Sequence, residues 1–575
     1  MRPPTGKPLD VGTGVVAASF GEDGSWLSIG RLHPRWGFVE LNGLPPFSDV
    51  HRGDPAATRR YRALMTSERH AWLRVEAVDG TRAAPRLAGA AGVPGSRWIT
   101  QRWETGGETG LVVRVAGTLD RPALAEITEV NPPAPTGAVT ALRAEGERLC
   151  IEAAALPALV TVEVSDGRWG LAEGGAELRL DQPRRTVDIS VALGPGLESP
   201  VTAPEPWVPP PARSGGIDGI VERALAYVRS CTALGYAAGE RAILTDHRLL
   251  PLSWTRDAYF QALLLLAAGV PGDTAIVGDH LRWVWQRCAR PDGRWMRSHH
   301  GNGRPKDLAF QADQQLYPFV ELADYWRSTG RLPDGVEWNR AVPDAWRAVL
   351  GAIEPATGLV ATEENAADDR IEAPFSAGSQ VLLWYTATRL AEEGLASAVG
   401  LESDALLATA ASVRAAFERL IVDDGRWAYA VDGRGRTVDY HDANEFPTAL
   451  APIWGFCRRE DPAWRGTMAF AFSSANPGFV DGPAGGLGSR HTQGVWPLGL
   501  VQAWVVSRIR GDAAGAAAAL DRLEDAAFAD GMLPEAIILT DGAAVPVRHW
   551  FAWPGAVLGA LWLLDRDDRL DVLEA

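Results

Sequence analysis

SPVTAPEPWVPPPARSGG occupies residues 199–216, and the spacing of apolar residues along the chain differs on its two sides. Proline fixes φ and has no backbone N–H, so a stretch this rich in proline can neither continue a strand ladder nor form a helix interior. We therefore place a linker at 201–216, between a first domain at 1–200 and a second domain at 217–575.

The first domain is predicted to consist of β-strands. Turn signals such as EDGS, VDGT and SDGR recur at short spacing, which is typical of hairpins rather than of strand–helix–strand units. Between these turns lie segments that alternate or are rich in β-branched residues. We expect an antiparallel β-sandwich built from GVVAASF, WLSIGRL, WGFVEL, AWLRVEAV, SRWITQRWET, GLVVRVAG, LVTVEVSD and VDISVAL.

The second domain has a helical period. Apolar residues recur at helical spacing beyond Gly216, and DG, PG and GG breakers separate the segments. Twelve helices suggest six hairpins, and six hairpins closed in a ring form an (α/α)6 toroid whose loops make a funnel at one end. The expected helices span 217–236, 254–270, 272–290, 309–330, 338–354, 375–396, 402–422, 445–457, 463–473, 490–510, 513–529 and 551–566.

Charge and hydropathy restrict the classes of partner. The net charge is −16 and the pI is near 5.2, which argues against nucleic acid, because a phosphate backbone requires clustered Lys and Arg. No apolar run is long enough for a bilayer, and no secretory signal is visible, so we expect no membrane partner and a cytoplasmic location. The sequence carries no signal for an oligomeric state.

Cysteine and tryptophan point to the kind of site. The four cysteines are far apart and form no CxxC pair, so we expect reduced thiols and no metal or other cofactor. The chain has 23 Trp but only 15 Phe and 9 Tyr. Because the rigid ring of Trp suits both stacking on a sugar and packing in a core, this composition favours a carbohydrate ligand only slightly.

Polar and aromatic residues gather where helices are expected to begin. WTRD at 254–257 precedes an apolar helix, so Arg256 and Asp257 can hold the hydroxyls of a pyranose while Trp254 packs against its ring. The alternative is a helix cap with a surface ion pair.

Two further segments have this character. DGRW ends at Trp295, and FQADQQ brings Gln311, Asp313 and Gln314 to the entrance of another helix. Amides and an acid are costly to bury without hydrogen bonds, so this run faces either a polar pocket or solvent. The pair at 299–300 lacks an HExxH pattern, and we predict no metal ligand there.

The segment 357–374, TGLVATEENAADDRIEAP, is an acidic loop before the sixth helix. Repulsion among close carboxylates is expected to raise the pKa of at least one of them, as a general acid requires. A solvated loop is the alternative interpretation. Its acidic residues are Glu363, Glu364, Asp368, Asp369 and Glu372.

The last constellation surrounds Glu535. It follows the apolar GML and precedes HWFAWP at 549–554. A single Glu in such a setting is well placed for a base that holds a water molecule. The aromatic candidates for contact with a sugar here are His549, Trp550 and Trp553.

These motifs resemble the glucoamylase-type family of (α/α)6 glycoside hydrolases, and parts of them resemble the related glycogen-debranching and processing α-glucosidase families. The similar features are WTRD, FQADQQLYP at 310–318, the acidic loop, and GMLPE at 531–535 before an aromatic helix start. Their order along the chain and a β-sandwich ahead of the helices also match.

The resemblance implies an inverting, exo-acting hydrolase that releases a terminal α-linked hexose, with glucose as the first choice. Glu535 matches the general base, and Arg256 and Asp257 match residues that clasp the terminal sugar. A Trp-Glu-Glu step carries the general acid in the glucoamylase pattern, and the nearest equivalent here is Asp368-Asp369. The order of preference for the acid is Asp368, Asp369 and then Glu372. The two carboxyl groups of an inverting enzyme are expected to lie roughly 6.5–9.5 Å apart.

Three other classes remain open. A phosphorylase of similar architecture would use phosphate in place of the base. A sugar epimerase or a lyase on the same toroid would use His and Tyr rather than two carboxylates. A non-catalytic carbohydrate-binding relative would keep the Trp residues and lose the acid.

Overall fold

The computed structural model describes most of the helical region and parts of the region before it. The described residues are 9–21, 23–33, 37–42, 72–77, 86–92, 95–105, 110–115, 118–120, 137–138, 141–152, 159–172, 175–180, 185–194, 214–234, 239–246, 251–306, 308–392, 394–422, 424–482, 485–527, 531–540, 543–547 and 551–575.

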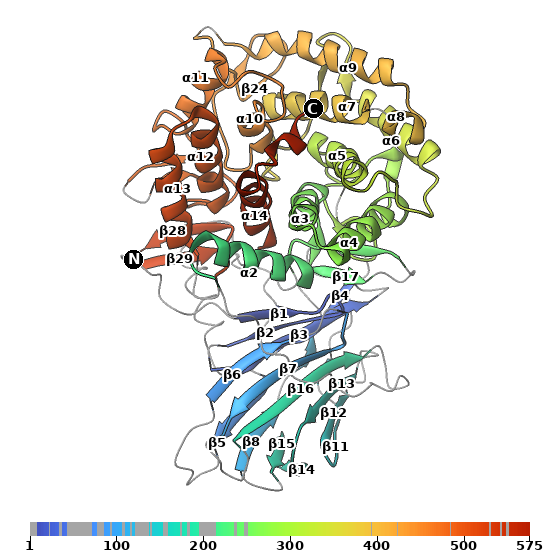
Figure 1. Ribbon diagram of the computed structural model, residues 1–575, viewed down its shortest axis with the longest axis vertical. Helices are drawn as coiled ribbons and strands as arrows, with labels where there is room; N and C mark the ends of the chain where they lie inside the picture. Colours follow the sequence, from blue (N-terminus) through green and yellow to red (C-terminus); the bar gives the residue numbers. More distant parts are fainter. Residues whose placement is uncertain are drawn as a thin grey trace.

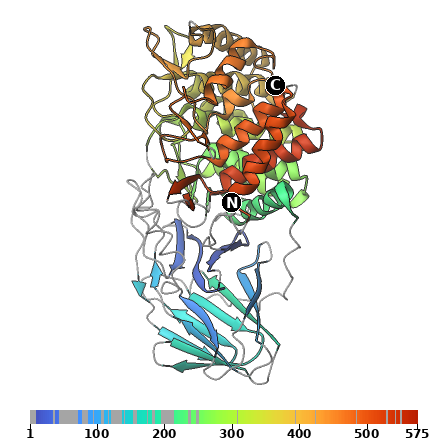
Figure 2. The ribbon, with the colours of Figure 1, turned by 90° about the vertical axis from the view of Figure 1, so that its left-hand side faces the viewer.

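The N-terminal region consists of β-sheets, as the hairpin signals predict, and the C-terminal region is helical (Figures 1 and 2). The larger sheet contains β1 (Leu9–Gly12), β2 (Val16–Phe20), β3 (Trp26–His33), β4 (Gly37–Asn42), β5 (Leu73–Ala77), β8 (Gly110–Val115), β9 (Thr118–Asp120), β10 (Gly137–Ala138), β14 (Arg168–Ala172) and β15 (Gly175–Arg179). The smaller sheet contains β6 (Arg86–Ala91), β7 (Trp98–Glu104), β11 (Ala141–Glu145), β12 (Arg148–Glu152), β13 (Leu159–Val164) and β16 (Thr186–Gly194).

The two sheets share one apolar core. Buried residues of β2 and β3 in the larger sheet belong to the same cluster as those of β7 and β16 in the smaller one. Gln101 of β7 joins them, because its Oε1 accepts a hydrogen bond from Nε1 of Trp26 at 2.7 Å. A buried amide with such a partner costs little, and it fixes the position of one sheet against the other.

All twelve expected helices overlap helices among the described residues. They are α2 (Gly216–Ser230), α3 (Thr255–Ala268), α4 (Pro271–Arg282), α5 (Ala312–Thr329), α6 (Trp338–Leu350), α7 (Ala377–Leu390), α9 (Ser403–Ala416), α10 (Phe446–Leu450), α11 (Pro462–Ala471), α12 (Pro497–Arg510), α13 (Ala513–Ala526) and α14 (Ala552–Arg566). One short helix, α8 (Leu395–Ala398), was not expected.

Two boundaries differ clearly from the expectation. The helix expected at 490–510 begins only at Pro497, which occupies the first turn of α12, where its missing N–H costs nothing. The helix expected at 445–457 is reduced to the five residues of α10 and continues as turns. Helix α12 is therefore shortened at its beginning, where Trp496 is extended, and α10 is shortened at its end.

Six helices pack side by side in a closed order. The order is α3, α5, α7, α10, α12 and α14, and α14 packs against α3 again. Helix α3 is buried on nearly every side, as an inner position requires, whereas α9 buries only Leu406, Ala410, Val413 and Ala416. Figure 1 shows α9, α11 and α13 outside this ring. No helix among the described residues is both long and apolar enough to span a bilayer.

The segments that precede the inner helices meet at one end of the ring. Trp254, Trp496 and Phe551 are the residues immediately before α3, α12 and α14, and all three have extended backbone angles. Unpaired N–H groups give a helix N-terminus a partial positive charge that favours oxygen ligands and carboxylates. The sequence therefore brings polar and aromatic side chains from distant segments to one place.

Candidate functional site

A cavity of about 320 Å³ lies at this end of the ring. Polar side chains from five separate segments line it together with the rings of three tryptophans and one phenylalanine. The lining residues are Trp254, Arg256, Asp257, Ala366, Ala367, Asp368, Asn444, His491, Trp496, Glu535, Phe551 and Trp553.

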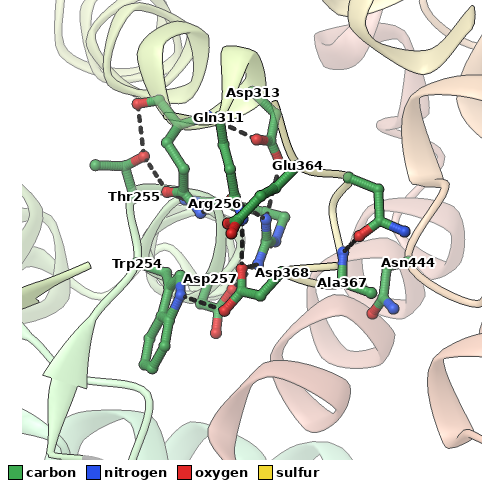
Figure 3. A network of polar contacts seen from close by, with 12 residues as sticks. Trp254, Thr255, Arg256, Asp257, Gln311, Asp313, Glu364, Ala367, Asp368 and Asn444 are labelled. Carbon is green, nitrogen blue, oxygen red and sulfur yellow. Dashed lines mark hydrogen bonds and ion pairs between the residues drawn. The ribbon is translucent and has the colours of Figure 1, made fainter. Parts of the chain in front are cut away.

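Arg256 is the central cation of this site (Figure 3). Its Nη1 donates to Asp313 Oδ2 at 2.8 Å and to Gln311 Oε1 at 3.2 Å. Its guanidinium also lies 3.4 Å from Asp257 and stacks over the ring of Trp553, 4.8 Å from the ring centre. Burial alone lowers the pKa of Arg256, but the surrounding carboxylates raise it more, so the side chain stays charged.

Replacing Arg256 with Met is expected to lower the free energy of unfolding by about 3–5 kcal/mol, because buried carboxylates would lose their counter-charge. Urea unfolding measures this loss. Arg508→Met is the matched control, since the ion pair between Arg508 and Asp565 is half-exposed and contributes at most about 1 kcal/mol. Equal losses in the two variants would show that Arg256 does not hold the site together.

Asp257 is almost wholly buried, so the alternative of a surface ion pair is wrong: Arg256 and Asp257 are 3% and 2% exposed. Thr245 donates a hydrogen bond to Asp257 Oδ2 at 2.8 Å. Burial raises the pKa of Asp257 to about 7, although Arg256 and the bond from Thr245 act in the opposite direction. A carboxyl group of this kind can accept or donate a hydrogen bond near neutral pH.

The acidic loop places Asp368 in the cavity through a tight turn. Asn365 Oδ1 accepts hydrogen bonds from the backbone N–H groups of Ala367 and Asp369, both at 2.9 Å. Asp368 itself has φ of +64°, in the left-handed region that Asp tolerates better than most residues. Such a conformation at a cavity is typical of residues that the surrounding structure holds in place.

Three donors hold the Asp368 carboxylate. Trp254 Nε1 donates to Oδ2 at 2.9 Å, and Gln311 Nε2 donates to Oδ1 at 2.7 Å (Figure 3). Arg256 Nη2 lies 3.5 Å from Oδ1. Burial raises the pKa of Asp368, but the charges of Arg256, Arg297 and His491 and the bond from Gln311 outweigh it, so its pKa lies below the ordinary value. The expectation that crowding raises the pKa is therefore wrong for Asp368.

Glu364 is the acidic side chain of this loop whose pKa is raised. Burial is the largest cause, and the nearby Asp368 adds to it, while Arg297 and Gln311 lower the pKa. Gln311 Nε2 bridges the two carboxylates, because it also donates to Glu364 Oε2 at 3.0 Å. The alternative of a fully solvated loop does not apply to Glu364 or Asp368.

Glu535 lies on the cavity wall and is 0% exposed. Thr492 Oγ1 donates to Glu535 Oε1 at 2.6 Å, which orients the carboxyl group. The chain then continues into the hairpin of β28 (Ala536–Thr540) and β29 (Ala543–Val547). Ile537 exchanges two backbone hydrogen bonds with Val495, at 2.8 and 3.1 Å, so the segments that carry Glu535 and Thr492 are tied together.

Six of the predicted side chains do not line the cavity, and two of these, Gln311 and Asp313, contact Arg256, which does. Trp295 is packed in an aromatic core cluster against Trp285 and Phe319. Gln314 is wholly buried, and its Oε1 accepts a hydrogen bond from the backbone N–H of Arg256. Asp369 pairs with Nδ1 of His491 at 3.1 Å, and His491 rather than Asp369 lines the cavity.

Glu372 is half-exposed and forms ion pairs with Arg436 and Arg490. The structure places this doubly paired carboxylate outside the lining of the cavity, so Glu372 stays the third choice for the acid. His549 and Trp550 lie outside the described residues.

Other cavity residues were missed in the sequence. Asn444 lies in HDANEFP, and His491 and Trp496 lie in SRHTQGVWP. Both segments are polar and aromatic runs directly before a helix, namely α10 and α12. The signal that identified WTRD was therefore present there too.

Glu445, beside Asn444, is a buried acid at the start of α10. It packs against α7 so closely that a Cβ on Gly378 would come within 2.3 Å of Glu445 Oε2. Burial raises the pKa of Glu445 to about 8, and the charges of Asp442 and Asp313 add to this, while a bond from Tyr429 and the charge of Arg256 lower it.

The proton on Glu445 links stability to pH. An acid whose pKa is higher in the folded protein stabilises the fold fully below its ordinary pKa of 4.5, and this contribution disappears as the pH rises through about 8. The free energy of unfolding of the wild type, relative to Glu445→Gln, is therefore expected to fall across that window. Denaturant unfolding at several pH values measures both proteins, and parallel curves would contradict the assignment.

Comparisons with known proteins give one family match and one curated relative. Residues 339–563 match the family model of metal-independent alpha-mannosidases, GH125. The match covers less than half of the chain, and it contains Asp368, Asn444, Glu535 and Trp553. A curated relative, the meiotically up-regulated gene 157 protein of Schizosaccharomyces pombe, is 29% identical over 147 residues. This segment is 25% of the chain and 28% of the length of that relative.

Two solved structures share the fold. A metal-independent α-mannosidase from Streptococcus pneumoniae, in a non-productive complex with α-1,6-mannobiose, is 19% identical, with a TM-score of 0.52, over 61% of this chain and 94% of that one. A bacterial glucoamylase in complex with acarbose is 10% identical, with a TM-score of 0.58, over 100% of this chain and 95% of that one. Both structures are under 25% identical to this chain, and the likeness shows that it shares the fold of these two glycosidases.

Proposed function

We propose that the protein is an inverting, exo-acting glycoside hydrolase that releases a terminal α-linked mannosyl residue. The observation that carries the proposal is the presence of two carboxylates, Asp368 and Glu535, on the wall of one cavity. They come from segments more than 160 residues apart in the sequence, since Asp368 precedes α7 and Glu535 follows α13. In this proposal, the region from 217 to 575 is the toroidal catalytic domain, 201–216 is its linker, and 1–200 is the accompanying β-sandwich domain.

Asp368 is the proposed general acid. In the free protein, it accepts hydrogen bonds from Trp254 and Gln311 and is held as a carboxylate. A sugar that fills the cavity excludes water and presents its glycosidic oxygen as an acceptor, and both changes favour the protonated carboxyl group. The acid then gives its proton to the leaving oxygen as the glycosidic bond breaks.

Glu535 is the proposed general base. It takes a proton from a water molecule whose oxygen attacks the anomeric carbon from the face opposite to the leaving group. The bond from Thr492 orients the carboxyl group of Glu535 on the cavity wall, where that water would be held. The product sugar has the inverted anomeric configuration.

The matched family favours mannose as the terminal sugar, because its model covers the part of the chain that carries Asp368 and Glu535. The glucoamylase structure favours glucose as the second candidate, because it matches the chain over its full length, including the β-sheet region. Arg256 and Asp257 are proposed to bind hydroxyls of either sugar, while Trp254, Trp496 and Trp553 surround the ring.

Product analysis tests this proposal. The purified protein is incubated with α-linked mannobioses and glucobioses, and proton NMR follows the first anomer that appears. We expect a terminal hexose to be released as the β-anomer without added phosphate. Release of the α-anomer would contradict inversion, release that requires phosphate would indicate a phosphorylase, and no release from any α-linked disaccharide would contradict hydrolysis.

A further inference from the structure

Asn444 carries an acceptor that no described residue satisfies. Its side chain is 1% exposed and lines the cavity with Asp257, Asp368 and Glu535. Asn444 Oδ1 is buried, and no donor among the described residues hydrogen-bonds to it. A buried amide oxygen without a partner is costly, and at a cavity wall this cost is removed when a ligand donates to it.

The orientation of this amide is fixed by its other end. Asn444 Nδ2 donates to Asp442 Oδ1, and the backbone N–H of Asn444 donates to the same oxygen at 2.9 Å. Exchanging the oxygen and nitrogen of the amide would place two acceptors against each other, so the hydrogen-bond network excludes the flipped form. Asp442 is in turn held by the Tyr440 hydroxyl at 2.5 Å.

Asn444 stands apart from the other polar groups of the cavity. Figure 3 draws Trp254 on one side of Asp368 and Asn444 on the other. Arg256 and Asp257 come from the start of α3, whereas Asn444 precedes α10. The neutral acceptor and the charged pair can therefore contact different hydroxyls of one sugar ring.

We propose that Asn444 binds a hydroxyl group of the terminal hexose through Oδ1 and thereby contributes to the selection of the sugar. The inference rests on the proposed function, because it takes the hexose of that reaction as the ligand. A neutral amide oxygen accepts from a hydroxyl and has no charge to attract an anion, so the ligand class is an uncharged sugar. Each hexose places its hydroxyls differently, so one fixed acceptor discriminates among hexoses.

Binding of the free monosaccharide tests this role without catalysis. Wild type, Asn444→Ala and Asn444→Ser are titrated by calorimetry with D-mannose, with D-glucose and with the 2-, 3-, 4- and 6-deoxy forms of the hexose that binds more tightly. We expect Asn444→Ala to bind that hexose roughly three- to tenfold more weakly, the effect of one neutral hydrogen bond. For one deoxy sugar, the wild type and Asn444→Ala are expected to bind equally well, because the hydroxyl that Asn444 accepts is absent.

Asn339→Ala is the matched control. It makes the same change at an exposed position of α6, so this variant is expected to bind the hexose and all four deoxy sugars as the wild type does. A loss in Asn444→Ala that is the same for all these sugars, or no loss at all, would overturn the role of Asn444. The Ser variant keeps a small polar group beside Asp442, so the comparison stands even where the Ala variant unfolds.

Failure of the hydrolase proposal gives a different result. If the protein binds the hexose with this selectivity but releases no sugar from α-linked disaccharides, the Asn444 proposal holds and the hydrolase proposal fails. If the protein hydrolyses these disaccharides but Asn444→Ala binds every sugar as the wild type does, the hydrolase proposal holds and the Asn444 proposal fails.

Discussion

Glu535→Gln is expected to lower kcat on an α-linked disaccharide by roughly 10²- to 10⁴-fold, the contribution of a general base. Glutamine keeps the shape of the side chain and can still accept the bond from Thr492, so the fold and the cavity are retained. It is not basic enough to take a proton from the attacking water. Steady-state kinetics and thermal unfolding are measured together, and KM is expected to change little.

The matched control for this variant is Glu524→Gln, which makes the same chemical change on an exposed face of α13 and is expected to retain full activity. A small external nucleophile adds a second criterion. If Glu535 is the base of an inverting reaction, azide added to Glu535→Ala is expected to form the β-glycosyl azide from an α-linked substrate. An undiminished kcat in Glu535→Gln would remove Glu535 from the mechanism.

Asp368→Asn is expected to show a loss that depends on the leaving group. A sugar leaving group requires a proton, so kcat/KM on an α-linked disaccharide is expected to fall by roughly 10²- to 10⁴-fold. A dinitrophenyl glycoside releases a stable anion that needs no proton, so its hydrolysis is expected to fall far less. The ratio of the two losses, measured on the same enzyme preparation, reports acid catalysis directly.

Asp369→Asn and Glu372→Gln separate the three acid candidates. Asp369 faces His491, and Glu372 is paired with two arginines at the surface. Neither variant is expected to distinguish the two leaving groups. A loss in Asp368→Asn that is equal for both substrates would make Asp368 a positioning residue, and a leaving-group-dependent loss in either neighbour would transfer the acid role to that neighbour.

Much of the fold could be predicted because each helix carries its own signal. The apolar period of α3, the proline at the start of α12 and the glycine after α5 mark elements without reference to any other segment. The early end of α10 is marked locally as well, because Pro452 follows its C-cap and Gly455 has φ of +80°. The expectation of a longer helix gave these two breakers too little weight.

The site was predictable where the chemistry is local. WTRD and GMLPE place a charged side chain beside apolar residues at the start of an element, and the structure puts both motifs on one cavity. The pKa of Asp368 was not predictable in this way. A count of carboxylates in 357–374 omits Arg256 and Arg297, which come from two other segments and lower that pKa.

Trp295 shows the limit of composition. Indole suits both a sugar and an aromatic core, and only the tertiary contacts with Trp285 and Phe319 distinguish these roles. Asn444 shows the opposite case, since asparagine before a helix is ordinary in sequence. Its proposed role depends on the carboxylate of Asp442, which binds the amide nitrogen and so leaves the amide oxygen for a ligand in the cavity.

The closed order of the inner helices also determines when the site can form during synthesis. Arg256 at the start of α3 stacks on Trp553 at the start of α14, and the backbone N–H of Ala552 donates to the carbonyl of Thr245 at 2.8 Å. A ribosome that has made α3 through α12 therefore holds a chain with an open ring and an unfinished cavity. Because contacts so distant in sequence form slowly, the nascent chain exposes the apolar flank of α3 until the last inner helix emerges.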